Sequence, residues 1–427
     1  MGLAKAKQSA TDARLDGHGP VPAAGWSAPA RAAALARFQA QGLPGPRDEY
    51  WRFTNPASLN QPDAIRASVF EAGEAPMFHQ VDAHRLVFVD GVFDAEASDA
   101  GAIANVEISM LDTSVPMDIH WASDLYGQLE ADGQSPVARP FAALNTAYAT
   151  QGALIRVTGQ ADKPVQFVYL HRDETSDAIV HHVVRVEEGA EITLLENGPA
   201  AARLNKVMEI DVAHGAQVNH IRTQGRDHER RAVTHLFARV AEKSTFKSFT
   251  LTVNGILTRN EVILDITGDE ATAHVAGAAL GDGQFHHDDT VFVTHDAVNC
   301  ESRQVFKKVL RNGAVGAFQG KILVQPGAQK TDGYQISQSL LLDGDSQFLA
   351  KPELEIYADD VACSHGSTSG AIDDEALFYL RSRGMPLADA QDLLVLAFVA
   401  EAIDEIEDEQ IRDIILERLR GWLERHR

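Results

Sequence analysis

The chain has 427 residues, of which 61 are acidic and 38 are basic, so its formal net charge is −23. This excess of acidic side chains argues against nucleic acid or an anionic membrane surface as a partner. The hydrophobic content of 44% suffices for a folded core, but no uncharged apolar run reaches the length of about 18 residues that a membrane-spanning helix requires.

The chain contains two cysteines, Cys300 and Cys363, which allow at most one disulfide and cannot hold a four-thiolate cluster by themselves. The opening segment lacks the apolar stretch of a secretory signal, so we expect a cytoplasmic protein with reduced thiols. The phosphate-loop pattern GxxxxGK[ST], a GxGxxG after a strand and the nucleophile elbow GxSxG are all missing. We therefore expect no ATP hydrolysis by this chain itself.

The N-terminal third is predicted to hold little regular β-structure. Residues 1–25 are rich in Ala, Gly, Pro and small polar types without clear periodicity, which predicts a mobile tail. Residues 26–150 are predicted to form a mixed, partly helical region. Its first helix follows Ser27, a candidate N-cap, and ends before Gly42.

Two further elements are predicted within the region 26–150. Two apolar runs flank Asp90-Gly91, a pair that favours a tight turn, so a hairpin is expected over 86–94. The segment FAALNTAYA at 141–149 has the apolar spacing of a short helix.

Residues 151–371 are predicted to be a long all-β region, because short alternating runs such as ALIRV, VQFVYL and HHVVRV replace the helical period. A Gly-Ala corner recurs at Gly189 and Gly215, 26 residues apart (215 − 189). A strand, a corner and a second strand at this period indicate a solenoid. A β-sandwich or a cupin-like barrel would also give short strands punctuated by glycine.

Helical periodicity returns in the C-terminal helical domain, residues 372–427. The pattern predicts three helices, which lie at about 373–383, 393–406 and 411–422. Asp373 or Asp374 is the expected cap of the first. The apolar side of these helices could receive a partner, or it could cap the open end of a solenoid, and the two roles are compatible.

Cys363 and His365 are the leading candidate metal ligands. They are two residues apart in a segment that begins like a buried strand, so both side chains point the same way. A thiolate and an imidazole supply half of a four-coordinate site. Asp359 and Asp360 are near in sequence, but adjacent carboxylates usually face solvent.

A second candidate metal site lies at 283–296, where His287, Asp289 and His295 have the parity to share one strand face. The charge-rich run HHDD at 286–289 is more typical of a loop or a solvated edge. Cys300 has no histidine at short range and is interpreted as structural.

Several segments of the sequence resemble those of a known family. The run at 352–403, PELEIYADDVACSHGSTSGAIDDEALFYLRSRGMPLADAQDLLVLAFVAEAI, resembles the signature block of the SufB/SufD family, scaffold components of the Suf iron–sulfur cluster assembly machinery. The similarity extends to four upstream segments, which lie at 42–56, 86–91, 141–157 and 318–342. Cys363, His365 and Gly366 match the Cys-x-His-Gly of the SufD branch, and the chain lacks the several cysteines expected of a SufB partner.

The resemblance implies a right-handed parallel β-helix core between helical terminal regions, in agreement with the 26-residue repeat. It further implies a non-catalytic scaffold subunit that meets a SufB-like subunit through the end of the β-helix and a SufC-like ATPase through the C-terminal helices. Cys363 and His365 would then hold a transient Fe–S cluster shared with the SufB-like subunit, with no cofactor stably bound. A homodimer is possible when these partners are absent.

Two other functional hypotheses stay open from the sequence. One is a β-helix enzyme that acts on polysaccharide through acidic residues, although such enzymes are commonly exported. The other is a cytosolic, cupin-like metal-dependent enzyme that uses His287, Asp289 and His295, and it requires metal in the isolated chain.

Overall fold

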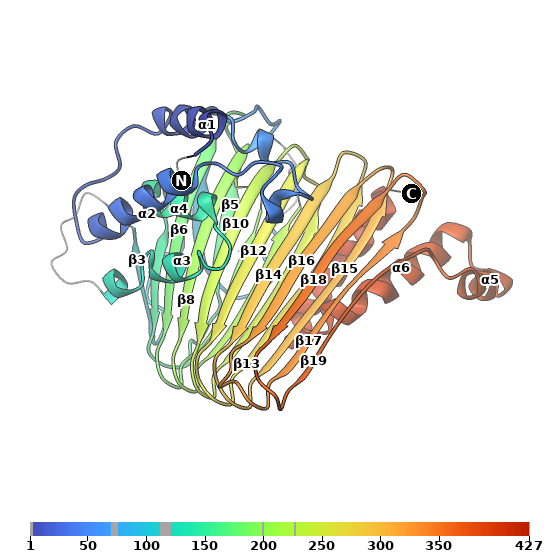
Figure 1. Ribbon diagram of the computed structural model, residues 1–427. Helices are drawn as coiled ribbons and strands as arrows, with labels where there is room; N and C mark the ends of the chain where they lie inside the picture. Colours follow the sequence, from blue (N-terminus) through green and yellow to red (C-terminus); the bar gives the residue numbers. More distant parts are fainter. Residues whose placement is uncertain (1–2, 70–75, 112–120, 199, 226–227, 427) are drawn as a thin grey trace.

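The computed structural model describes residues 3–69, 76–111, 121–198, 200–225 and 228–426 (Figure 1). Residues 1–2 of the predicted tail, and 70–75 and 112–120 of the predicted N-terminal region, therefore lie outside the described residues. Two β-sheets wound as one solenoid form the centre of the molecule. The chain alternates between them, so each coil contributes one strand to each sheet.

Sheet A contains, in spatial order, β19 (Ala362–Gly370), β17 (Asp332–Leu341), β15 (Glu301–Arg311), β13 (Thr272–Asp282), β11 (Thr245–Val253), β9 (Gln217–Gln224), β7 (Glu191–Asn197), β5 (Val165–Leu170), β1 (His84–Val89) and β2 (Val92–Asp94). Sheet B contains, in the same order, β18 (Gln347–Ile356), β16 (Val315–Val324), β14 (His286–His295), β12 (Leu257–Ile266), β10 (Arg231–Val240), β8 (Arg203–Val212), β6 (Asp177–Val186), β4 (Ala153–Val157) and β3 (Val106–Met110). Neighbouring strands run parallel except for the pairs β1–β2 and β3–β4.

The predicted mainly-β solenoid is confirmed. Strand β6 pairs with β8 at an offset of 26 residues (203 − 177), whereas β16 pairs with β18 at an offset of 32 (347 − 315). The corner glycines Gly189 and Gly215 both adopt positive φ, at 66° and 65°, which glycine does without steric cost. Because strands pair one coil apart in parallel, the sandwich and barrel alternatives are wrong.

Side chains alternate between the interior of the solenoid and its outer faces. Matched interior positions of four successive sheet B strands hold Val186, Val212, Val240 and Ile266, all with 0% exposure. This column belongs to a large apolar cluster that runs through the coils. At the rate of about 25 cal/mol per Å² of buried apolar surface, such stacking is the main source of solenoid stability.

The N-terminal elements cover the outer face of sheet B. They are α1 (Lys5–Asp16), α2 (Ala28–Gln41), α3 (Gln128–Asp132) and α4 (Pro140–Tyr148), with short 3₁₀ turns at Glu49–Trp51, Pro56–Ser58 and Trp121–Asp124. The predicted mobile tail is wrong for α1, because its Arg14 is 2% exposed and donates to Asp177 (3.1 Å) and to the Pro62 carbonyl (2.8 Å). Contacts more than 40 residues away in sequence therefore hold this helix.

Three local predictions in the N-terminal region are confirmed, namely one hairpin and the positions of two helices. Asp90 and Gly91 have φ of 51° and 83° and join β1 to β2 as the expected hairpin. Helix α2 begins after Ser27 and α4 occupies the predicted 141–149 segment, starting at Pro140.

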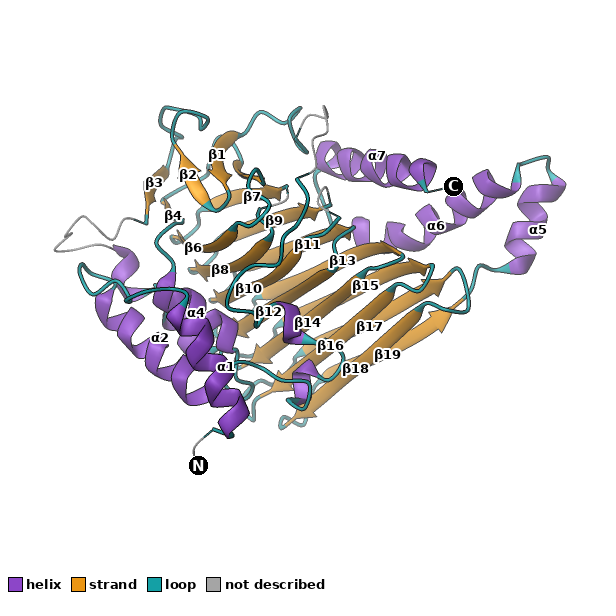
Figure 2. Cartoon of the chain, turned by 90° about the horizontal axis from the view of Figure 1, so that it is seen from above, coloured by secondary structure: helices purple, strands orange, loops and turns teal. Residues whose placement is uncertain are grey.

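The C-terminal domain contains α5 (Asp374–Ser382), α6 (Leu387–Ile403) and α7 (Glu409–Arg425), close to the three predicted helices. Asp373 caps α5 by accepting from the backbone N–H groups of Glu375 and Ala376, at 2.8 and 2.9 Å. Helices α6 and α7 pack on the outer face of sheet A (Figure 2), whereas α5 projects away and buries no side chain. The alternative that these helices cap the open end of the solenoid is therefore wrong, and the role of their apolar side in binding a partner stays a prediction.

The last coil, formed by β18 and β19, is the open end of the solenoid. These are the terminal strands of the two sheets among the described residues. Their residues are exposed or half-buried throughout, whereas the preceding strands β16 and β17 alternate with buried positions. The other end closes on the antiparallel strands β2 and β3. Within the described part of the chain, none of the helices has the length and apolar character to cross a membrane.

Acid should weaken the fold through neutral histidines such as His295. Its ring is 0% exposed, and burial lowers its pKa to about 4. Between the unfolded value of about 6.5 and about 4, only the unfolded chain binds the proton, so stability falls as pH falls through this window. His295→Gln, which keeps a polar group near Ser302, should remove on the order of 2 kcal/mol of this pH-dependent loss. Urea unfolding at pH 7 and pH 4.5 measures the loss, and equal losses in both proteins would contradict the assignment.

Candidate metal-binding site

Cys363 and His365 lie on β19, side by side in the last coil. The strand register places Cys363 beside Gly333 and His365 beside Gln335 of β17. Gly333 and Gln335 are buried inside the solenoid, so the two candidate ligands occupy the interior face of a coil that no further coil covers. Cys363 is half-buried and His365 is exposed, and both open toward the end of the solenoid.

Cys363 lies on the apolar side of this end. It packs against a buried apolar cluster that contains Ile322 and Val324. Gly333 leaves room for the thiol, because a Cβ at that position would stand 3.2 Å from Sγ. Burial, together with the Asp332 carboxylate, raises the pKa of the Cys363 thiol. A bound cation would oppose this shift by stabilising the thiolate.

His365 begins the polar side of the same strand. The next two interior positions are Ser367 and Ser369, whose hydroxyls bond to Ser337 (3.1 Å) and Ser339 (2.9 Å) of β17. The last coil thus presents a soft sulfur beside apolar side chains and an imidazole beside hydroxyls. This pair matches the thiolate and imidazole that zinc and iron sites use.

The pair is not completed within the described residues, where no group of three metal-ligating side chains is assembled. The nearby Asp359 and Asp360 are exposed, and Asp360 pairs with Lys330. A four-coordinate site built on Cys363 and His365 therefore needs ligands from outside the described part of this chain.

The second candidate site, His287, Asp289 and His295, is contradicted. All three share the interior face of β14, as their parity predicts, but they are bonded to other side chains, two of them to Lys308 and one to Ser302. His287 accepts from Lys308 (3.0 Å), Asp289 pairs with Lys308 (2.7 Å), and His295 meets Ser302 (2.8 Å). The HHDD run is a buried strand rather than a loop, and the cupin-like enzyme hypothesis loses its site. His295 is the last residue of β14, so its bond to Ser302 lies away from the two bonds that Lys308 makes with His287 and Asp289.

A buried polar network that was not predicted from the sequence lies inside the solenoid. Glu196, with 1% exposure, pairs with His220 (2.6 Å) and with Lys206. Burial favours the neutral carboxyl, yet Lys206 and His220 keep the pKa of Glu196 well below its usual range. A hydrogen-bonded line then joins Arg222, Thr234, Asn260 and His287 across both sheets. The sequence signal for this network is that its polar residues occupy every second position of their strands, which places them on one face.

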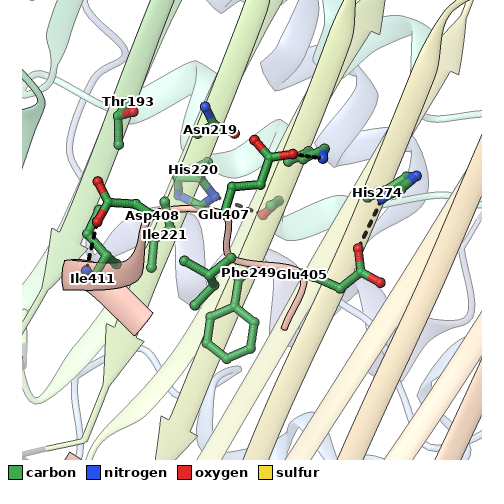
Figure 3. A pocket seen from close by; sticks show the side chains of 13 residues that line it. Thr193, Asn219, His220, Ile221, Phe249, His274, Glu405, Glu407, Asp408 and Ile411 are labelled. Atoms are coloured by element: carbon green, nitrogen blue, oxygen red, sulfur yellow. Dashed lines mark hydrogen bonds and ion pairs between the residues drawn. The ribbon is translucent and has the colours of Figure 1, made fainter. Parts of the chain in front are cut away.

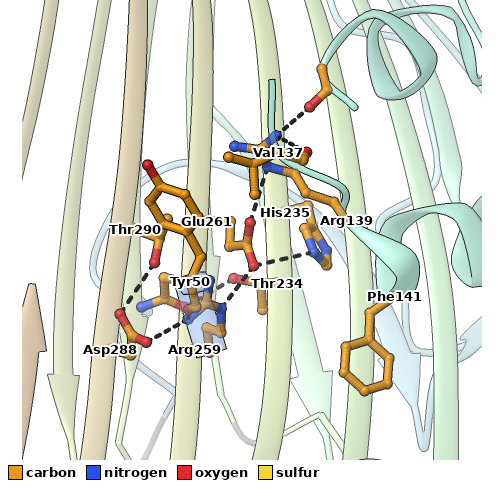
Figure 4. Close-up of polar contacts among 12 residues, drawn as sticks. Tyr50, Val137, Arg139, Phe141, Thr234, His235, Arg259, Glu261, Asp288 and Thr290 are labelled. Atoms are coloured by element: carbon orange, nitrogen blue, oxygen red, sulfur yellow. Dashed lines mark hydrogen bonds and ion pairs between the residues drawn. The ribbon is translucent and has the colours of Figure 1, made fainter. Parts of the chain in front are cut away.

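A second charged cluster lies under the N-terminal layer on the outer face of sheet B (Figure 4). Arg139 donates to Glu261 (3.0 Å), and Arg259 bridges Glu261 (2.7 Å) and Asp288 (2.5 Å). Although burial acts to raise the pKa of Glu261, Arg259 and its neighbours lower it to about 2. Arg259 also donates to the Tyr50 carbonyl (2.8 Å), so this cluster fastens the N-terminal segment to the sheet.

A pocket lies between the outer face of sheet A and the loop that joins α6 to α7 (Figure 3). Lys247, His274 and Arg303 occupy matched positions on β11, β13 and β15. Glu405 meets His274 (3.0 Å) and Arg303 (3.1 Å), and Glu407 meets Lys247. The hydrogen bond to His274 lowers the pKa of Glu405. These paired charges anchor the helices rather than leave groups for a ligand.

Comparison with known proteins identifies the family. The model of the SUF system FeS cluster assembly, SufBD core domain, matches residues 169–398, more than half of the chain. The chain belongs to the SufB/SufD family. It is 29% identical over 399 residues to the iron–sulfur cluster assembly protein SufD of Escherichia coli, covering 90% of each chain.

Other SufB/SufD relatives agree. The SufBD family protein slr0076 of Synechocystis is 29% identical over 85% of this chain and 84% of its own length. SufD of Bacillus subtilis is 25% identical over 66% of each chain. The relationship to the two SufD proteins assigns the SufD branch, supports a role in iron–sulfur cluster assembly and disfavours the polysaccharide-active hypothesis.

Because Cys363 lies at the open end and Cys300 is buried, we expect their thiols to react at different rates. Cys300 is 1% exposed with Sγ 3.2 Å from the Gly268 carbonyl oxygen, whereas Cys363 is half-buried. Iodoacetamide should therefore alkylate Cys363 at least about tenfold faster than Cys300 in the folded chain, with a rate that rises toward alkaline pH. Peptide mass spectrometry measures both rates, and Cys363→Ser supplies the control. Equal rates at both thiols would show that the end is covered.

Proposed function

We propose that this chain is a non-catalytic, cytoplasmic scaffold subunit of a Suf-type complex, in which a nascent iron–sulfur cluster is built at a subunit interface. The observation that carries the proposal is the position of Cys363 and His365 on the interior face of the uncovered last coil. Cys363 and His365 supply half of the ligands of a metal site, and a SufB-like subunit across the interface supplies the other ligands. The cluster is the cargo of the complex.

The chemistry of an assembly site favours such sharing. A cluster that is held by two chains can be released when the chains separate, whereas a closed set of four ligands on one chain holds its metal tightly. Both Cys363 and His365 must be deprotonated to bind iron. Covering the end of the solenoid also removes bulk water from the pair, which strengthens each metal–ligand interaction.

A SufB-like subunit is the partner that suits the open end. The interior positions of β18 present Phe348, Leu354 and Ile356 without a covering coil. The outer edges of β18 and β19 carry backbone groups that a partner strand would satisfy. The end of a homologous solenoid offers the same combination of apolar interior side chains and unpaired strand edges. Without that subunit, a second copy of this chain would cover the same surface.

We propose that the ATPase partner docks on the projecting helix α5 and the start of α6. Phe378 and Tyr379 are 74% and 55% exposed, and Leu387 and Leu393 are 44% and 45% exposed. Phe378 and Tyr379 lie on α5, which buries none of its own residues, and Leu387 and Leu393 lie in the first half of α6. Large exposed apolar side chains gathered in this way are typical of an interaction surface. Movement of this attachment by a SufC-like ATPase would reach the open end through the short connection between β19 and α5.

Removal of either ligand tests the shared site. In the co-purified complex, Cys363→Ala or His365→Ala should lower cluster formation at least about tenfold, because each deletes one of few ligands. His214→Ala, at a half-exposed turn elsewhere on the solenoid, is the matched control and should leave assembly unchanged. Iron and sulfide analysis of the reconstituted complex measures the effect. Normal assembly by both ligand variants in an intact complex would refute the interface site.

Substitution on α5 tests the ATPase surface. Phe378→Asp should abolish co-purification with the ATPase, because a charge enters the proposed contact. The free energy of unfolding should change by less than about 0.5 kcal/mol, since the side chain is largely exposed. Val92→Asp, which alters a 56% exposed apolar residue on the distant hairpin, is the matched control. Retention of the ATPase by Phe378→Asp would move the docking surface elsewhere.

A further inference from the structure

Gln335 lies directly beneath His365 in the stacked coils. It is the register partner of His365 on β17, and both occupy the interior face. Its side chain is 0% exposed, and neither the amide nitrogen nor the amide oxygen has a hydrogen-bond partner among the described residues. A buried amide without partners is a costly choice for an interior position, where leucine or methionine would serve packing better.

The chain also leaves space for this amide. A Cβ at Gly320, across the interior on β16, would lie 2.2 Å from Gln335 Oε1, so any larger residue there would displace the amide. Gly333, beneath Cys363, likewise leaves room for the thiol. The coil below the candidate ligands therefore combines two glycines with one unsatisfied polar group.

A metal-bound imidazole has a specific need that this amide can meet. One ring nitrogen binds the metal, and the other carries an N–H that is almost always donated to a carboxylate, a carbonyl or water. That bond fixes the tautomer and the orientation of the ring. The serines beside His365 on β19 are already bonded to serines of β17, whereas the Gln335 carbonyl oxygen is uncommitted.

We propose that Gln335 is a positioning residue for His365, whose ring donates its free N–H to Gln335 Oε1 when the other nitrogen binds metal. This inference rests on the proposed function of Cys363 and His365 as ligands. It adds a residue from the coil below to a site that the last coil alone does not define. It also explains why an interior position of β17 holds an amide and why Gly320 faces it.

Gln304 supplies a matched control. It is the register partner of Gln335 on β15, is 0% exposed, and also has both amide atoms unpartnered. It lies one coil deeper, however, and Gln335 separates it from His365. A general effect of losing an interior amide should therefore appear in both variants, whereas an effect on His365 should appear only at Gln335.

The experiment adds cobalt(II) to the co-purified complex of this chain and its SufB-like subunit, and it follows the part of the thiolate-to-cobalt absorption band that Cys363→Ala removes. Gln335→Leu should weaken cobalt binding about 10- to 100-fold, the range found when the partner of a ligating histidine is removed. Gln335→Glu, which keeps an acceptor oxygen at the same length, should restore binding. Gln304→Leu should bind as the unmodified chain does. Circular dichroism checks that each variant is folded.

The outcomes separate this inference from the one on which it rests. Unchanged binding by Gln335→Leu, or an equal loss in Gln304→Leu, would overturn the role of Gln335. A cobalt band that is the same in Cys363→Ala as in the unmodified complex would overturn the proposed site and this inference together. A Cys363-dependent band that Gln335→Leu does not weaken would leave the ligand pair standing and remove only Gln335.

Discussion

Parallel, in-register stacking of coils is the constraint on which the rest of the structure depends. Each strand satisfies its backbone groups with the strand one coil before and the strand one coil after. The last coil, β18 and β19, has only one such neighbour among the described residues. Whatever side chains it carries on its interior face are therefore left exposed or half-buried, while the same positions one coil earlier are largely buried. Cys363 and His365 owe their accessibility to this place in the stack.

The interior of the solenoid is divided into an apolar and a polar half. Near the corners that follow the sheet B strands, the stack is made of Val and Ile side chains. Across the interior, charged groups such as Glu196 and Lys206 must pair because an unpaired buried charge is prohibitive. Since side chains of one coil lie over those of the next, this division extends to the open end, although His295 interrupts the apolar column between Ile266 and Val324. There it places sulfur on the apolar half and imidazole at the start of the polar half.

Local rules explain which parts of the fold the sequence could predict. The Asp90-Gly91 turn and the Asp373 cap depend on a few neighbouring residues, and both form as expected. The 26-residue repeat was visible only twice because the coil offset grows to 32 toward the open end. Helix α1 was missed because its stability comes from Arg14 and Asp177, which are 163 residues apart. No local pattern carries such information.

The candidate ligands were also found from local spacing, but their environment was not. Alternation placed Cys363 and His365 on one face, and the family resemblance suggested a shared site. The run HHDD was misjudged because polar residues on a strand suggest solvent, whereas here the partners of His287 and Asp289 come from the facing sheet. Gln335 gave no signal at all in the sequence. Only the strand register shows which residue stands beneath His365.

The two cysteines show how far position in the stack decides chemistry. Cys300 lies at the start of β15 and Cys363 near the start of β19, two coils later in the same sheet, and burial raises the pKa of both thiols. Cys300 is covered by later coils and contacts a backbone carbonyl, so its sulfur has no route to a metal. Cys363 packs against apolar side chains on one side, and on the other side no coil of the described chain covers it. A thiol of ordinary type thus becomes a candidate ligand because no later coil of the described chain buries it.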